Sequence, residues 1–387
     1  MMKVFRRYIM ALSGYRFLLL ALLAVFVGCS QDEEEQQQAT PKLNIYIYAP
    51  GQMTPTRGDG QSTLGADAEV KSLQLWVYNS NNTSQLLGGL ELGTTELTRL
   101  NSAGSESYSM ELPSSFAYGP NPVVDVYVLA NVTKNNCGDD KGMDSSLAEL
   151  EDFKMGKNYF APTTEVPADG LPMSGVMRRQ SLVQRNDVFH LNEANIKLER
   201  VVSKIKFVFS SLSPEVDPNV KSVTITKVTL DAGILNKYEY LFLEDAPYHL
   251  GGDIETNPAN IKEMTLLENI GIVKRNADPT VYAYKSSETA AEYEERINSA
   301  PDEALTKSPW LYLRESDQKL TGKIYYRIGG STDAVASFSM ASGDFHRNQT
   351  WIVYAYYLGS SKLNVSTVEV TDWGDGGSLG NQGVYNW

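Results

Sequence analysis

The first residue with a recognisable chemistry is Cys29, which follows Gly28 and an unbroken apolar run over residues 17–27. A bilayer span needs about 20 apolar residues, so this shorter run predicts a cleaved export signal rather than a transmembrane helix. A thiol at this position is typical of lipoprotein signals, in which Cys29 takes a diacylglycerol and becomes the new N-terminus. The alternative is an ordinary secretory signal with an incidental cysteine.

Catalytic and metal-binding chemistry is not indicated elsewhere. His190, His249 and His346 stand apart from one another, and no nucleophile elbow, H-E-x-x-H helix or P-loop occurs. Asp372 and Asp375 do not complete an EF-hand calcium loop. Glycosidases need only two carboxylates, but no pair stands out among 47 acidic residues. The sequence therefore predicts no enzyme, no metal site and no cofactor.

Charge and cysteine content limit the partners and the means of stabilisation. Residues 1–57 carry a net charge of +2 and the whole chain −13, so the chain from Gly58 onward carries −15. Such an acidic surface would repel phosphates, which excludes nucleic acid as a partner. Cys137 is the one cysteine after the signal, so we expect an unpaired thiol and no intramolecular disulfide.

The elements that follow the signal read as short strands. Residues 30–40 are polar and predict a solvated tether. In residues 43–48, LNIYIY, apolar and polar side chains alternate as in a half-buried strand. A run rich in Gly, Pro and Thr follows, so this strand stands between two flexible segments. This run contains Arg57-Gly58-Asp59, the tripeptide that integrins bind in other proteins. A match of only three residues is expected by chance, so it carries little weight.

Further alternating segments predict two all-β domains that meet between about residues 195 and 215. Short helices are expected at 145–153 and 286–298. Strands are expected at residues 70–79, 107–113, 123–132, 171–177, 196–212, 222–233, 280–285, 322–329, 349–359 and 362–373.

Several segments, in order, resemble one family, the fimbrillins of Bacteroidales, the major subunits of a pilus shaft. They are VGCS, TPTRG, VYVLANV, LPMSG, IKLERVVSKIKF, LYLRES, FHRNQTWIVYAYYL and VEVTDWGDGGSLGNQGVYNW. Ser203 and the run Gln349-Thr350-Trp351 depart from the more usual family pattern.

The resemblance implies two transthyretin-like or Ig-like β-sandwich domains in tandem. It divides the chain into a signal peptide (1–28), a propeptide (29–57), an N-terminal sandwich (58–205) and a C-terminal sandwich (206–387). It also implies that a trypsin-like, arginine-specific protease cuts between Arg57 and Gly58. The cut would release a plug strand whose buried side chains are Leu43, Ile45 and Ile47.

A neighbouring copy would then donate its C-terminal strand, giving a head-to-tail polymer. The candidate donor residues are Leu363, Val365, Val368, Val370, Val384 and Trp387. The implied partners are further copies, accessory pilus subunits, the protease, the outer membrane through the lipid, and an unidentified host or bacterial surface ligand. The implied location is the cell surface, with mature chains in extracellular fimbriae.

Alternatives remain open at this point. Residues 43–48 can be an uncut first strand, and Arg57 can be an ordinary solvated arginine. The chain can be a tip or anchor subunit of the same pilus, or a monomeric lipoprotein that binds glycan or protein through exposed Tyr and Trp. An extracellular carbohydrate hydrolase ranks last.

Overall fold

The computed structural model describes residues 40–50, 66–156, 162–186, 188–231, 233–235, 238–242, 262–316, 318–340, 345–360, 362–370 and 384–386. Its contacts divide the chain after Pro41, and the structure below is that of residues 42–387. No helix within these described ranges is both long and apolar enough to cross a membrane.

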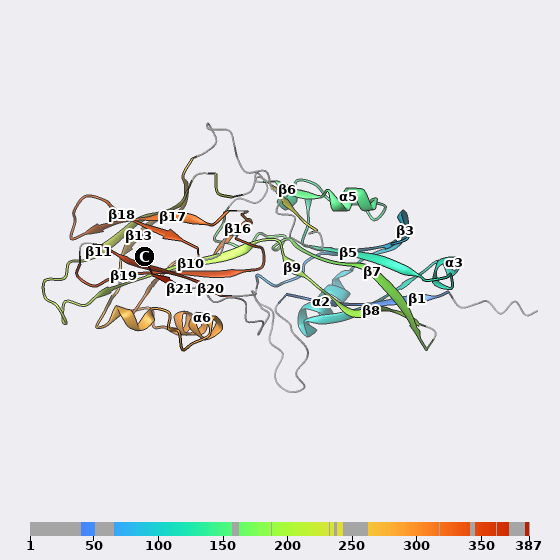
Figure 1. The fold of residues 1–387 in the computed structure, drawn as a ribbon, viewed down its shortest axis with the longest axis horizontal. Coiled ribbons are helices and arrows are strands. Elements are labelled where there is room, and N and C mark those ends of the chain that lie inside the picture. Colours follow the sequence, from blue (N-terminus) through green and yellow to red (C-terminus); the bar gives the residue numbers. More distant parts are fainter. Residues whose placement is uncertain are drawn as a thin grey trace, which may run out of the picture. The chain divides into compact units, whose positions relative to one another are not determined.

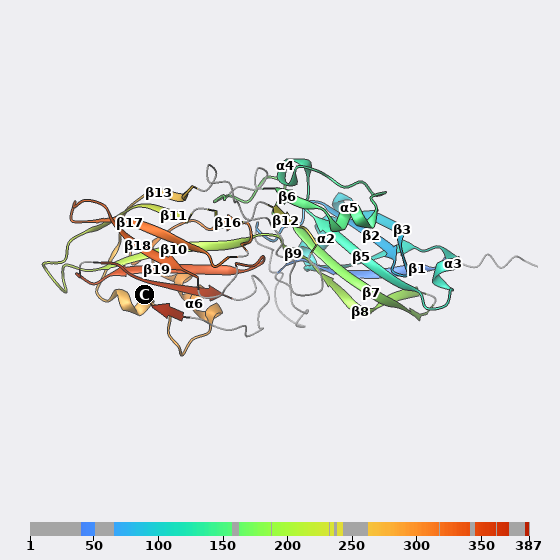
Figure 2. The ribbon, with the colours of Figure 1, turned by 45° about the horizontal axis from the view of Figure 1, so that its top comes forward.

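Among the described residues, eight strands form the first sheet, in the order β3-β2-β5-β7-β8-β1-β4 with β9 paired to β7 (Figures 1 and 2). The strands are β1 (Lys42–Tyr48), β2 (Leu73–Asn79), β3 (Asn82–Glu91), β4 (Ser105–Glu111), β5 (Val123–Ala130), β7 (Met173–Arg185), β8 (Val188–Lys197) and β9 (Glu199–Arg200). The helices beside them are α2 (Thr94–Ala103), α3 (Ser114–Ala117), α4 (Lys134–Cys137) and α5 (Leu147–Glu151).

A bulge in β7 lets this sheet fold over its own core. The first part of β7 pairs with β5, and its last four residues pair with β8. Within the part that pairs with β5, Arg179 has φ +54°, and its N–H donates to Asp125 Oδ1 at 2.6 Å. Two residues of β7 are thereby displaced from the ladder, which bends the strand. The two layers enclose a core of alternate side chains that includes Leu73, Leu75 and Val77, as the period-2 pattern predicts.

Two further sheets form a second sandwich. One has the order β14-β10-β19-β20-β21, with β15 and β16 also paired to β10, and the other has the order β13-β11-β17-β18. Their strands are β10 (Ser203–Leu212), β11 (Val223–Leu230), β13 (Met264–Ile272), β14 (Arg275–Asn276), β15 (Thr306–Lys307), β16 (Leu311–Leu313), β17 (Thr321–Ile328), β18 (Ala334–Ser339), β19 (Thr350–Tyr357), β20 (Asn364–Val370) and β21 (Val384–Asn386).

Helix α6 (Ala290–Ser299) covers the outer face of the β10-β19-β20 sheet (Figure 1). Thr289 caps it with its side chain, within the expected helical segment. Ile205, Phe207 and Phe209 point into the core between the two sheets, as predicted. The intervening residues of β10 are buried as well, because α6 and Trp310 lie over them. The long strand expected over 196–212 is divided among β8, β9 and β10.

The prediction of a strand at residues 280–285 is wrong. Residues 279–282 form the 3-10 helix η1 (Pro279–Tyr282). Asp278 caps it by accepting a hydrogen bond from the Thr280 N–H, and Pro279 supplies the φ of a first helical residue. These two local preferences outweigh the alternation in TVYAYK.

A buried charge network connects β12 (Tyr238–Tyr240), which pairs with β6 (Lys154–Gly156), to the second sandwich. Arg347 pairs with Glu315, with Nε–Oε1 at 2.5 Å, and also donates to the main-chain oxygens of Tyr240 and Leu241. The N–H of Glu315 donates to Glu239, whose carboxyl pKa is raised by burial and then by the charge of Glu315. Removing one member of such a pair leaves a buried charge uncompensated, at a cost of about 3–5 kcal/mol.

Ser203 and Gln349, the two departures from the family pattern, contact each other. The N–H of Gln349 donates to Ser203 Oγ at 3.0 Å, and Ser203 Oγ donates to the carbonyl oxygen of His346. Nearby, Arg200 donates to Asn348 Oδ1 at 3.2 Å. The segments IKLERVVSKIKF and FHRNQTW, far apart in the sequence, therefore meet at the start of β10.

The prediction of an all-β chain of β-sandwiches with few short helices is confirmed. Two apolar cores lie between sheets, one composed of residues from 43–198 and the other of residues from 205–365. The domain boundaries drawn from the sequence stay a prediction.

Asn131 connects three segments of the first sandwich and is fully buried. Its Oδ1 accepts from the N–H of Lys71 at 2.7 Å, and its Nδ2 donates to the oxygens of Glu69 and Leu171 at 2.8 and 3.0 Å. Its φ of +59° is one that asparagine tolerates better than most residues. Gly170 must stay small, since a Cβ there would lie 2.3 Å from Asn131 Nδ2.

We predict that Asn131→Ala lowers the free energy of unfolding by about 3 kcal/mol, because it leaves several buried backbone groups without partners. Asn135→Ala, on the exposed side of α4, is the matched control and should change it by less than about 0.5 kcal/mol. Urea unfolding followed by circular dichroism measures both. Equal stability of the two variants would contradict the role given to Asn131.

Candidate functional site

Strand β1, the predicted plug, is an internal strand of the first sheet. It pairs antiparallel with β4 along its whole length, from Lys42 opposite Glu111 to Tyr48 opposite Ser105. On its other side it pairs parallel with β8. An edge strand could be removed without exposing a second edge, but removing β1 would expose unpaired backbone groups on two strands.

The apolar side chains of β1 fill the core of the first sandwich. Leu43, Ile45 and Ile47 are 0–1% exposed, whereas Tyr46, on the opposite face, is 40% exposed. Burying three such side chains contributes roughly 4–9 kcal/mol. The alternation predicted for residues 43–48 therefore corresponds to an inward and an outward face.

Strand β4 depends on β1 for its place in the sheet. Within the described ranges, β4 pairs with β1 and with no other strand. Its residues Tyr108 and Met110 are buried in the same core as the three β1 side chains. An empty β1 position would thus leave β4 without a ladder and open the core to water, so the position requires an occupant.

Residues 67–70, on the C-terminal side of the predicted cut, are held by contacts that do not involve β1. Arg200 Nε donates to the carbonyl oxygen of Asp67 at 2.7 Å, and Lys204 Nζ lies 3.6 Å from Asp67 Oδ2. Val70 N–H donates to Asn101 Oδ1 at 2.8 Å. None of these contacts involves a residue of β1, so they hold residues 67–70 independently of it. Arg57 and Gly58 lie outside the described residues, as does Cys29.

The predicted donor residues fall on two strands with different roles. Leu363, Val365 and Val368 are buried in the second sandwich, where β20 pairs with β19 over seven residues. Strand β21 begins at Val384 and, among the described strands, pairs with β20 alone, over three residues. Val370 ends β20. Trp387 lies outside the described residues.

The remaining candidate residues do not converge. His190 lies on β8 opposite Asn44, His346 lies near the start of β19, and His249 falls outside the described residues, as do Asp372 and Asp375. Across the described ranges, no group of three His, Cys, Asp or Glu side chains is placed to hold a metal ion.

Cys137 is a free thiol, as expected. It ends α4 and is 2% exposed, packed in the cluster beneath that helix and α5. Burial, followed by the charge of Glu239, raises the pKa of the Cys137 thiol to about 12. The thiol is therefore protonated and unreactive at neutral pH.

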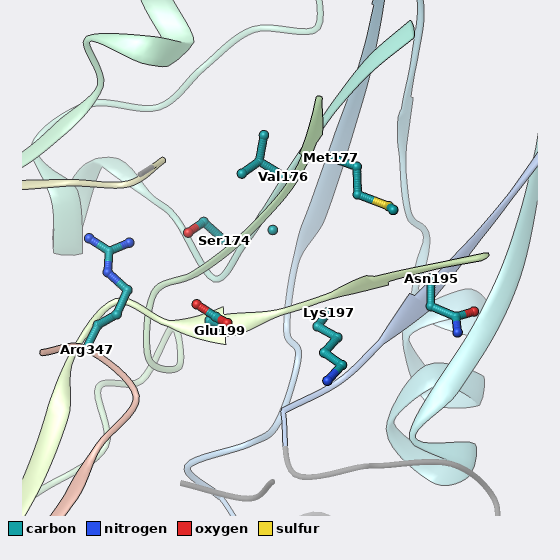
Figure 3. Close-up of a pocket in the computed structure, with 8 residues that line it drawn as sticks. Ser174, Val176, Met177, Asn195, Lys197, Glu199 and Arg347 are labelled. Carbon is teal, nitrogen blue, oxygen red and sulfur yellow. The ribbon is translucent and has the colours of Figure 1, made fainter. Parts of the chain in front are cut away.

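A cavity of about 320 Å³ lies where β7 and β8 diverge (Figure 3). It is lined by Ser174, Gly175, Val176, Met177, Asn195, Lys197, Glu199 and Arg347. None of these described lining residues is aromatic, and Glu199 is the one carboxylate among them.

Comparison with known proteins identifies the architecture. The model of a family described as the major fimbrial subunit protein (FimA) matches residues 39–263. A cell adhesion protein from Parabacteroides distasonis ATCC 8503 is 16% identical over 88% of this chain and 99% of its own, with a TM-score of 0.51. No curated protein matches the sequence.

Two other solved structures come from Porphyromonas gingivalis. The tip fimbrial protein Mfa3, with a C-terminal truncation, is 13% identical over 86% of this chain and 99% of its own, with a TM-score of 0.49. A fimbrilin of strain W83 is 12% identical over 83% and 91%, with a TM-score of 0.45. At these identities the Parabacteroides structure supports a shared fold and nothing further.

We predict that Ile45→Ala lowers the free energy of unfolding of the uncut chain by about 2–5 kcal/mol, through lost burial and a cavity. Tyr46→Ala, one residue away on the outward face, should change it by less than about 1 kcal/mol. Thermal unfolding of both variants provides the measurement. A larger effect of Tyr46→Ala would mean that the inward and outward faces of β1 are misassigned.

Proposed function

Because the chain belongs to the major fimbrial subunit protein family, which consists of structural subunits rather than enzymes, we propose that it polymerises by protease-triggered strand exchange. The family places it at the cell surface as a structural subunit for fimbriae and adhesion. The observation that carries the mechanism is the position of β1, which is an internal strand of its sheet. Residues 51–65, which contain Arg57, connect it to the rest of the first sandwich in the sequence.

Processing begins, in this proposal, with a cut after Arg57 by an arginine-specific protease. The cut leaves β1 attached to the first sandwich by non-covalent contacts alone. The lipid on Cys29 lies on the same side of the cut, so one hydrolysis separates the subunit from both its plug and its membrane anchor. Asp67 and its partners Arg200 and Lys204 support this step, since they hold the new N-terminal region in place.

The vacated position then receives a strand from another copy. Strand β20 is a poor donor, because withdrawing it would expose Leu363, Val365 and Val368 and break its ladder with β19. Among the described strands, β21 has a short ladder on one side. We therefore assign the donor to the last residues, SLGNQGVYNW, including Val384 and Trp387, and leave β20 in its own sandwich.

Such a contact joins unlike surfaces and cannot close between two copies, so it propagates into a filament. A pre-formed groove keeps the ordering cost low, and β-augmentation adds main-chain hydrogen bonds to side-chain burial. Accessory subunits of the same fimbria would use the same groove or the same tail. Adhesion to a host or bacterial surface would then be a property of the assembled fibre.

We predict that Arg57→Ala yields uncut, lipidated precursor and no filaments, because the protease requires arginine at this position. Arg185→Ala, an exposed arginine on β7, should leave processing and assembly unchanged. Negative-stain microscopy of the cell surface and N-terminal sequencing measure the two outcomes. Normal fimbriae from Arg57→Ala would contradict the processing step, and a wild type found only as single particles would favour the monomeric lipoprotein.

We also predict that a chain ending at Val370 folds and is cut, but fails to polymerise by itself. It retains β20 and therefore the core of the second sandwich. Its groove remains intact, so it should still accept a tail and terminate filaments formed by full-length chains. Polymerisation of cut, purified protein followed by light scattering tests this. Unaided growth of the shortened chain would assign the donor to another segment.

A further inference from the structure

A buried amine on β10 lies against the carboxamide of a residue on α6. Lys206 is 8% exposed, and its Nζ lies 2.6 Å from Oδ1 of Asn298, near the end of the helix. The ring of Trp310 covers the same amine, with its centroid 4.0 Å from Nζ. Lys206 forms no ion pair with any described residue, so the carboxamide is its hydrogen-bond partner in the part of the chain that the structure describes.

The environment shifts the protonation equilibrium of Lys206 toward the neutral amine. Lys204 shares the face of Trp310, at 4.7 Å, and Lys307 donates to the carbonyl oxygens of Asn298 and Ala300. Burial lowers the pKa of the Lys206 amine to about 8, the charge of Glu294 opposes this change, and Lys204 and Lys307 add to it. Roughly a tenth of the amine is therefore unprotonated at pH 7, and an unprotonated amine is a nucleophile.

The acceptor is held in place and belongs to an exposed residue. Lys307 fixes the main chain at Asn298 and Ala300, while Lys206 itself donates to Oδ1. Asn298 is exposed, so ammonia formed from its Nδ2 has a path to solvent. Glu294 lies one helical turn earlier, is half-buried, and has no hydrogen bond or ion pair to other described residues, which leaves its carboxylate able to accept a proton.

We propose that Lys206 and Asn298 form an intramolecular isopeptide bond. The neutral Nζ attacks Cγ of Asn298, the Nζ–Cγ bond forms, the Cγ–Nδ2 bond breaks, and one ammonia leaves. Glu294 takes the proton lost by Nζ and returns it to the departing nitrogen, so the step needs no oxidant and no other reactant. No external reagent has to reach the buried amine, since both partners belong to this chain.

The bond would supply a covalent constraint that cysteine chemistry cannot. Only Cys29 and Cys137 occur in the sequence, and the second is buried alone. A bond between residues 92 positions apart would enclose β11, β13 and α6 in one loop. Closing such a loop restricts the unfolded chain, as a disulfide does. The proposal is independent of strand exchange, because it concerns the second sandwich of a single subunit.

The test is peptide mass spectrometry on the full-length folded protein. Trypsin should release residues 205–221 and 297–307 as one branched peptide, lighter than the sum of the two by one ammonia. Lys206→Arg and Asn298→Ala should abolish it, and Lys204→Arg, the matched control, should retain it. Lys206→Arg should also lower Tm by about 10 °C. Unlinked peptides 207–221 and 297–307 alone, with trypsin cutting after Lys206 of folded wild type incubated at pH 9, would overturn the proposal.

Kinetics provides a second, separate readout. Freshly folded protein should form the bond roughly tenfold faster at pH 9 than at pH 7, since the neutral fraction of an amine with a pKa of about 8 rises by that factor. Glu294→Gln should slow formation at least about tenfold, whereas Glu295→Gln, exposed on the same helix, should not. A rate that Glu294→Gln leaves unchanged would remove Glu294 from the mechanism. A branched peptide that forms no faster at pH 9 than at pH 7 would rule out attack by the neutral amine.

Discussion

The structure depends on one constraint, that the position of β1 cannot remain empty. Strand β4 has β1 as its partner in the described sheet, and three β1 side chains fill the core between the layers. Backbone groups and apolar surface would both be exposed if β1 left without replacement. A strand held in this way is suited to exchange rather than to simple release.

The last two strands of the second sandwich, β20 and β21, are held to different degrees. Strand β20 belongs to its core, whereas β21 adds a short ladder at one edge. Under the proposed mechanism, a subunit would give up its tail without unfolding and would receive a tail only after losing its plug. The asymmetry between a tightly held internal strand and a loosely held edge strand would then give assembly a direction.

Buried polar groups with several partners connect distant segments of the described chain. Asn131 satisfies backbone groups of three segments, and Arg347 with Glu315 fastens β12 to the second sandwich. Such groups add directional contacts between segments that are distant in the sequence. The closely placed Lys206 and Asn298 extend this pattern from hydrogen bonding to a covalent bond. Each of these features involves residues from at least two strands or helices.

The sequence by itself determined the local elements and the faces of the strongly alternating strands. Leu43, Ile45 and Ile47 are predicted to face inward because a strand has a period of two, and Ser146 and Thr289 cap helices within the predicted segments. Strand β3, with two adjacent glycines, and helix α2, with Leu100 as its one buried side chain, have weak patterns and were not predicted. Only the tertiary structure decided that β1 lies between β4 and β8, that β20 and β21 differ in burial, and that Arg347 meets Glu315. Pairings of this kind join residues tens to hundreds of positions apart, and the period of a single strand contains no information about its neighbours.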